Sequence, residues 1–371
     1  DKNEENIEDI IDGIDNKIDQ EKNNTEVSFS EPVLVQVPYE EGCDNINPLH
    51  CMLPFPSTAF LREDSTTVTG YRVNYTETTV PGSGTFRQVD VPGLNRLDGM
   101  SPSTQIMTAF EEDPVLADVA NQSTIEKSLI DGHPTVILNL NTGEKVAHWA
   151  ELDSRTDDKG PTILYIRTLR GLDHNAAYGI GISGLTNSTG GLISPSLALK
   201  ALIDGSSTDA PDVELRRESF TNLFEKLESL GYERENLQAA WEFHTASTES
   251  IVGGMLHMRE DALNSLGDGG IGCNVTSTED NYGDDNQTFR RIRGTITTPQ
   301  YLLNPDEPPS LMSRDEAGIP IFTGHSEVPF TLIIPQVLAD NSTSGPLVVF
   351  GHGFMGTGEA TISGARGWSQ T

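Results

Sequence analysis

The chain has 371 residues and is strongly acidic, because 56 Asp and Glu against 24 Lys and Arg give a formal net charge of −32 at pH 7. Nucleic acids and anionic membrane surfaces attract proteins through basic patches, so this balance excludes both as expected partners. No apolar run approaches the roughly 18 residues of a membrane span. We therefore expect no transmembrane segment and a secreted or cell-surface protein.

The first 32 residues are predicted to be an acidic, disordered linker without chemistry of its own. Acidic side chains outnumber basic ones here, and such segments bury too little apolar surface to fold alone. Ile7, Ile11, Ile14 and Ile18 have the spacing of a short amphipathic helix, which is the alternative. No signal peptide is present, so we expect a processed or excerpted piece of a longer protein.

Two cysteines near the start of the predicted ordered region form a candidate disulfide. Cys43 and Cys51 flank a turn-rich loop and have no nearby second pair of ligands. A small disulfide in an oxidising compartment is therefore our interpretation, with a metal site as its rival. Cys273 is left over, either as a buried thiol or as the partner of a cysteine beyond Thr371.

The pattern from about residue 65 to 185 predicts short β-strands. Residues 135–140 and 145–150 flank an Asn-Thr-Gly-Glu turn and predict a hairpin. Residues 163–168 and 178–182 predict further strands, at the spacing of a β-sandwich.

Helices are predicted after these strands. One begins at Ser194-Pro195 and ends at Gly205. A one-sided apolar stripe over 220–230 and a third segment at 251–266 predict two more. Together the patterns predict a β-rich domain with appended helices over 33–266.

Two groups of residues have the composition of metal sites without the required spacing. His148 lies near Glu151 and Asp153 at a predicted hairpin end, where a structural role is the other interpretation. Residues 279–286 belong to a predicted loop, 267–286, that lacks the residue order and distal glutamate of an EF-hand. We therefore predict no metal and no other cofactor, and a solvated acidic loop.

The most informative stretch is 345–358, an apolar run followed by closely spaced glycines. Residues 347–350 predict a fully buried strand. The segment Gly351-His352-Gly353-Phe354-Met355-Gly356 then matches two patterns. One is the G-x-G-x-x-G fingerprint of dinucleotide-binding proteins, and the other is the His-Gly oxyanion-hole loop of α/β-hydrolases.

The strands before this loop favour the second pattern. Residues 291–297 and 328–334 predict two longer strands ahead of the buried one. α/β-hydrolases begin with such an antiparallel pair, whereas a dinucleotide fold places its fingerprint after the first strand of its own domain. We therefore predict that 267–371 is the incomplete start of an α/β-hydrolase domain.

Five stretches, in this order along the chain, are similar to the sequences of one family. They are Cys43…Cys51-Met52-Leu53-Pro54-Phe55-Pro56-Ser57, Leu94-Asn95-Arg96-Leu97-Asp98-Gly99-Met100-Ser101-Pro102, His148-Trp149-Ala150-Glu151-Leu152-Asp153, Ala240-Trp241-Glu242-Phe243-His244-Thr245 and Gly351-His352-Gly353-Phe354-Met355-Gly356. Over roughly 42–358 the chain resembles secreted bacterial α/β-hydrolases related to surface lipases with an all-β N-terminal lipase domain. The resemblance implies an accessory domain ahead of a Ser-His-Asp hydrolase domain that cleaves a small-molecule or lipid ester.

The chain departs from this family in one respect, because no G-x-S-x-G elbow occurs in the 371 residues. In these hydrolases the triad follows the oxyanion loop, and only 357–371 remain here. We therefore predict that the chain is truncated before its nucleophile and cannot hydrolyse esters alone. The expected oxyanion donor is the Phe354 N–H, Gly353 permits close backbone approach, and His352 orients the loop rather than acting as the base.

Three functions remain as hypotheses. The first is the N-terminal part of a secreted lipase-like or esterase-like enzyme. The second is a non-catalytic β-sandwich binding or surface module, supported by the absent nucleophile and the acidic surface. The third is a nucleotide-dependent oxidoreductase, supported by the glycine fingerprint. None of the three specifies an oligomeric state.

Overall fold

The structure is a computed structural model and its contacts divide the chain into two compact units, 1–247 and 248–371. The division lies before helix α6 (Gly254–Leu266), rather than at the expected 266/267 boundary. The predicted linker, 1–32, lies outside the described residues. These are 33–80, 89–154, 160–267, 270–283, 286–307, 309–341, 343–353 and 356–358.

Both units mix helices with antiparallel sheets, which confirms the mixed α and β class. In the first unit, two three-stranded sheets have the orders β3-β6-β5 and β4-β7-β8. A smaller pair is formed by β1 (Leu61–Glu63) and β2 (Tyr71–Val73). The strands of the two larger sheets are β3 (Ile106–Ala109), β4 (Thr135–Asn139), β5 (His148–Leu152), β6 (Ile163–Thr168), β7 (Ala177–Ser183) and β8 (Leu237–His244).

The two larger sheets share one apolar core. Alternate residues of each strand point into it, as the period of two in strands requires. Leu164 and Ile166 of β6 meet Ile180 and Ile182 of β7 in this cluster, and all four are fully buried. The first unit therefore contains two sheets packed around a common core, with the predicted strands 163–168 and 178–182 in place.

The opposite face of β7 is covered by helix α5 (Arg217–Glu228). A Cβ at Gly179 would lie 2.5 Å from Leu223 Cδ1, and one at Gly181 would lie 3.1 Å from Leu227 Cδ2. Only glycine lets the helix approach the strand this closely. The Gly-Ile-Gly-Ile alternation of β7 thus turns a bare backbone toward the helix and branched side chains toward the second sheet.

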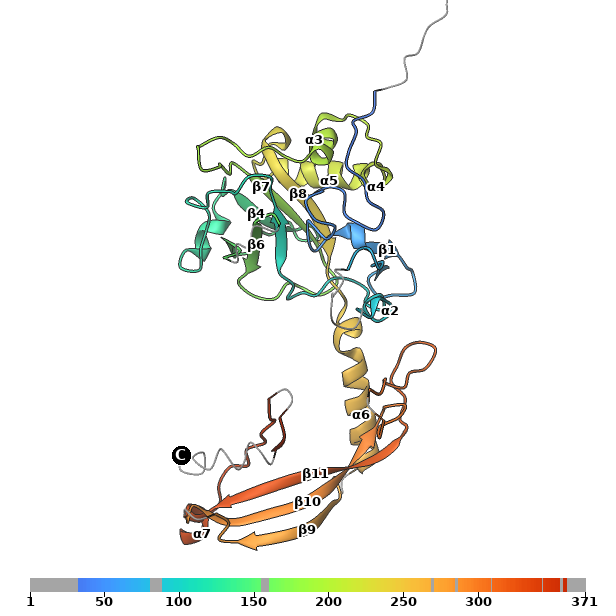
Figure 1. Ribbon diagram of the computed structural model, residues 1–371, viewed down its shortest axis with the longest axis vertical. Helices are drawn as coiled ribbons and strands as arrows, with labels where there is room; N and C mark the ends of the chain where they lie inside the picture. Colours follow the sequence, from blue (N-terminus) through green and yellow to red (C-terminus); the bar gives the residue numbers. More distant parts are fainter. Residues whose placement is uncertain are drawn as a thin grey trace, which may run out of the picture. The chain divides into compact units, whose positions relative to one another are not determined.

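Three helices gather on this side of the sheet that contains β7 and β8, as Figure 1 shows. They are α3 (Leu197–Asp204), α4 (Pro211–Leu215) and α5. The Ser196 hydroxyl accepts a hydrogen bond from the Leu199 N–H at 3.2 Å and caps α3. Gly205 ends α3 in the left-handed region at φ 73°. The predicted end at Gly205 and the buried apolar stripe of α5 are confirmed, whereas α3 begins at Leu197, after the predicted start at Ser194-Pro195.

The remaining elements of the first unit are short. They are η1 (Thr58–Phe60), α2 (Val91–Leu94), η2 (Ile125–Leu129) and η3 (Arg234–Asn236).

The hairpin predicted over 135–150 is only partly correct. Its turn forms, since the Asn139 N–H donates to the Glu144 carbonyl at 2.9 Å and the Val146 N–H donates to the Ile137 carbonyl at 2.9 Å. The chain then crosses to the other sheet, so that β4 pairs with β7 and β5 pairs with β6. The turn residues therefore form the predicted turn, whereas burial in the shared core determines which strand β4 and β5 each pair with.

The second unit contains one three-stranded antiparallel sheet of order β11-β10-β9 (Figure 1). Its strands are β9 (Cys273–Asp280), β10 (Thr288–Gln300) and β11 (Gly324–Pro335), and its helical segments are η4 (Glu249–Gly253), α6 and α7 (Gln336–Asp340). The predicted strands 291–297 and 328–334 are confirmed within β10 and β11.

Strand β9 corrects the prediction of a loop over 267–286. Its acidic end pairs with arginines of β10, at 2.6 Å between Arg290 Nε and Asp280 Oδ1 and 2.7 Å between Arg291 Nη2 and Glu279 Oε2. Cross-strand pairs of opposite charge favour strand pairing. The acidic residues that indicated a loop are therefore compatible with a strand.

The predicted buried strand at 347–350 is wrong. Leu347, Val348, Val349 and Phe350 are 77%, 72%, 89% and 53% exposed, and they are not assigned to a strand. No strand pairing in the described part of the chain includes them. A short apolar run becomes a strand only when a neighbouring strand takes up its backbone hydrogen bonds.

None of the described helices has both the length and the hydropathy that a membrane crossing needs.

Candidate functional site

The predicted oxyanion loop is exposed where the structure describes it. His352 Nδ1 lies 2.8 Å from the Gly353 carbonyl oxygen, and the Gly356 N–H donates to the same oxygen at 2.9 Å. Two donors therefore hold the Gly353 carbonyl. Phe354, the predicted oxyanion donor, lies outside the described residues, so its role stays a prediction.

Neither Gly351 nor Gly353 is required by local packing. A Cβ at either position would meet no described atom within 4 Å, and neither residue has a positive φ. The backbone is therefore open on the side that a side chain would cover. This openness is what a close approach of a ligand to the main chain requires.

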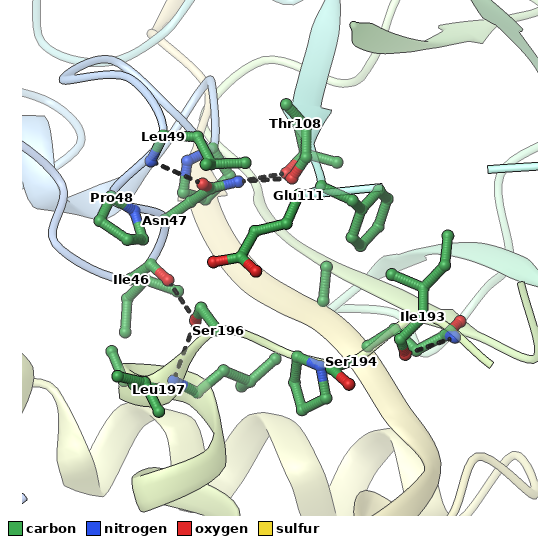
Figure 2. Close-up of a pocket in the computed structure, with 18 of the residues that line it drawn as sticks. Ile46, Asn47, Pro48, Leu49, Thr108, Glu111, Ile193, Ser194, Ser196 and Leu197 are labelled. Carbon is green, nitrogen blue, oxygen red and sulfur yellow. Dashed lines mark hydrogen bonds between the residues drawn. The ribbon is translucent and has the colours of Figure 1, made fainter. Parts of the chain in front are cut away.

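A second candidate site lies in the first unit, as a cavity of about 340 Å³ (Figure 2). Segments far apart in sequence line it. They are Val37 and Pro38, the loop between Cys43 and Cys51 with Pro54 after it, the end of β3 with the residues after it, the start of α3 with the residues before it, and β8. Its volume falls within the range of small-molecule pockets.

The disulfide loop forms one wall of this cavity. Cys43 and Cys51 are bonded, with their Cα atoms 4.5 Å apart, which confirms the predicted disulfide over the metal alternative. Asn47 lies in the loop that they close, and its Nδ2 donates to the Ala109 carbonyl at 2.8 Å and to Thr108 Oγ1 at 3.1 Å. The loop is thereby attached to the end of β3.

Two further contacts hold the loop against the helices. The Ser196 hydroxyl donates to the Ile46 carbonyl. Arg216 Nη2 lies 2.7 Å from Asp44 Oδ1, and Asp44 is fully buried. A buried carboxylate needs such a partner, because an unpaired charge in the interior is costly. The wall is therefore pre-formed rather than dependent on a ligand.

One carboxylate at the cavity, that of Glu111, belongs to an exposed side chain. Figure 2 shows the Glu111 side chain extending between the wall of Asn47 and Pro48 and the wall that contains Ser196. No hydrogen bond or ion pair joins it to another residue that the structure describes. The adjacent Glu112 differs, because it accepts hydrogen bonds from Asn187 Nδ2 at 3.2 Å.

Both ring nitrogens of His148 are hydrogen-bonded to other residues. Its Nδ1 donates to the Val146 carbonyl at 2.7 Å, and its Nε2 accepts from the Thr135 hydroxyl at 2.8 Å. Burial is the main cause that lowers the pKa of His148 to about 4. Glu151, its suggested co-ligand, is paired with Arg167 at 2.5 Å. These contacts favour the structural interpretation of His148.

His133 extends this hydrogen-bonded chain. The Ala120 N–H donates to its Nε2 at 2.9 Å, so the proton lies on Nδ1, which is 2.8 Å from the Thr135 carbonyl oxygen. The rings of His133 and His148 meet edge to face, with centroids 5.8 Å apart. Burial lowers the pKa of His133 as well. Both imidazoles are thus held in the neutral form.

The acidic residues of 279–286 are only partly available for a cation. Arginines of β10 take the carboxylates of Glu279 and Asp280, and 284–285 lie outside the described residues. In the part of the chain that the structure describes, no three His, Cys, Asp or Glu side chains group as metal ligands. Cys273 is free and exposed, which excludes the buried-thiol option.

Comparison with protein-family models found no match, and comparison with curated protein sequences found none either.

Proposed function

We propose that the chain is the N-terminal part of a secreted ester hydrolase and supplies one loop of its oxyanion hole. The observation that carries this proposal is the order of elements in the second unit. An antiparallel pair, β10 and β11, precedes the exposed Gly351-His352-Gly353 loop. The disulfide between Cys43 and Cys51 is compatible with an extracellular location.

The proposed chemistry places a backbone donor at the developing alkoxide of the ester. Two donors hold the Gly353 carbonyl, His352 Nδ1 and the Gly356 N–H. The donor that we propose is the Phe354 N–H, and His352 has the role of orienting the loop rather than of acting as the base. Such a donor stabilises the transition state by about 3 kcal/mol.

The nucleophile belongs outside these 371 residues in this proposal, since no G-x-S-x-G elbow occurs among them. An oxyanion hole stabilises only what a nucleophile has formed. The chain alone is therefore expected to be inactive on p-nitrophenyl esters of short and long acyl chains. The longer protein, with its downstream residues, is expected to hydrolyse them.

The test uses Phe354→Pro in the longer protein, because proline has no N–H to donate. We expect kcat to fall by about 100-fold or more. Phe354→Leu keeps the N–H and is the matched control, expected to retain most activity. Full activity of Phe354→Pro would refute the donor assignment, and serine-dependent turnover by residues 1–371 alone would refute the position of the nucleophile.

A non-catalytic binding module is the second candidate function, and the cavity in the first unit favours it. That cavity is bounded by residues of one compact unit and needs nothing from the glycine-rich loop. A longer protein that hydrolyses none of these esters would favour this candidate.

A further inference from the structure

The cavity of the first unit is lined largely by apolar side chains, and two of its buried polar side chains, those of Gln238 and Trp241, are already hydrogen-bonded. Gln238 bonds to the main chain of Leu185 in both directions at 2.7 Å. The Trp241 Nε1–H donates to the Pro56 carbonyl at 2.9 Å, so this indole offers the cavity no free donor. Ile193, Leu199 and other apolar side chains complete the lining. An occupant therefore gains mainly by burying apolar surface.

The size of the cavity limits its occupant. A water molecule takes about 30 Å³ in the liquid, so about 340 Å³ holds roughly the volume of eleven waters. A molecule of about ten non-hydrogen atoms matches this space.

The charge of the cavity selects the polar end of the occupant. Glu111 and Glu112 are its two charged lining residues, and no Lys, Arg or His lines it. The Glu111 carboxylate projects into the space without a partner among the described residues (Figure 2). An unpaired carboxylate beside an apolar surface attracts a cationic group and repels an anionic one.

We propose that this cavity is a binding site for a small amphiphilic amine, with its apolar body between the disulfide loop and α3 and its ammonium group on Glu111. The site excludes fatty-acid carboxylates, which have the same apolar body and the opposite charge. This inference is independent of ester hydrolysis, because it needs neither the glycine-rich loop nor a nucleophile. The pre-formed wall, attached through Asn47 and Ser196, keeps the ordering cost of binding low.

Calorimetric titration of the chain with octylamine, octanol and octanoate tests the site. The three probes share a chain length and differ in the charge of the head group. We expect saturable binding of octylamine, about threefold tighter than that of octanol, because an ion pair with the exposed Glu111 carboxylate is weakened by solvent screening. Octanoate is expected to bind more weakly than either.

Three variants separate the causes. Glu111→Gln is expected to remove the preference for octylamine over octanol and to leave octanol binding unchanged. Glu126→Gln removes an exposed carboxylate of η2 outside the cavity and is the matched control for net charge. Ser194→Trp fills the cavity from an exposed lining position and is expected to abolish binding of all three probes without lowering Tm.

Several outcomes would overturn the proposal. They are no saturable binding of octylamine, equal binding of octylamine and octanoate, an amine preference that survives Glu111→Gln, and a Ser194→Trp variant that binds normally. Loss of ester hydrolysis in the Phe354→Pro variant bears on the proposed enzyme alone, so the two proposals fail separately.

Discussion

The buried histidine pair makes the first unit sensitive to acid. His148 is fully buried, and its pKa is lowered from 6.5 to about 4 mainly by burial. In the unfolded chain His148 therefore binds a proton below about pH 6.5, whereas in the folded chain it binds one only below about pH 4. Since the unfolded state then holds more protons, the free energy of unfolding falls as the pH falls through this window.

The magnitude follows from the two pKa values of His148, 6.5 unfolded and about 4 folded. Linkage gives a loss of about 2 kcal/mol on going from pH 7.5 to pH 5, and the loss approaches about 3 kcal/mol below pH 4. His133 adds to this effect, because its Nε2 accepts from the Ala120 N–H and has no room for a second proton.

Urea unfolding followed by tryptophan fluorescence at pH 7.5 and pH 5 measures this loss. His148→Gln removes the titrating group, while its amide oxygen can still accept from the Thr135 hydroxyl. We expect the fall in stability between the two pH values to be about 2 kcal/mol smaller in His148→Gln than in the wild type. His257→Gln, which changes an exposed histidine of α6, is the control. An equal pH dependence in wild type and His148→Gln would refute the reasoning.

Three other outcomes are expected. Arg216→Met should destabilise the first unit by about 3–5 kcal/mol, because it leaves the buried Asp44 carboxylate without its cationic partner. Arg234→Met, at a more exposed ion pair, should cost about 1 kcal/mol or less in the same urea titration. Equal losses of stability in the two variants would contradict this assignment. Reducing the bond between Cys43 and Cys51 should lower stability by about 2 kcal/mol, and an intact mass unchanged by reductant would contradict the disulfide. NAD and NADP should show no saturable binding by calorimetry, and micromolar binding would favour the oxidoreductase hypothesis.

The parts of the fold that the sequence predicted are those with local causes. Gly205 has its own capping chemistry, so the end of α3 was predicted, whereas the start was placed at Ser194-Pro195 instead of at the Ser196 cap. The alternation in β7 likewise depends on residues next to one another. The partners of β4 and β5 could not be predicted, because a strand pattern specifies which face is buried and not which strand lies beside it.

The failures have long-range causes. The acidic end of β9 was predicted as a loop because of its acidic composition. The prediction failed because Arg290 and Arg291 of another strand neutralise these charges. The run at 347–350 was predicted as a strand because its apolar residues have the pattern of a buried strand. No described strand pairs with it. The cavity was missed entirely, since Asn47, Glu111 and Ser196 become neighbours only in the folded unit.

The hydrogen bond from the Trp241 Nε1–H to the Pro56 carbonyl joins positions 185 residues apart. At about 5–20 residues per second, a ribosome needs roughly 10–40 s to add the intervening chain. For most of that interval the segment containing the disulfide loop has been made, while Arg216 and β8, which hold it in the finished unit, have not. A thiol oxidant that meets Cys43 and Cys51 in this period would close their loop before its binding surface exists. The first unit can therefore complete its core only after β8 has been synthesised, however early its N-terminal loop becomes covalently closed.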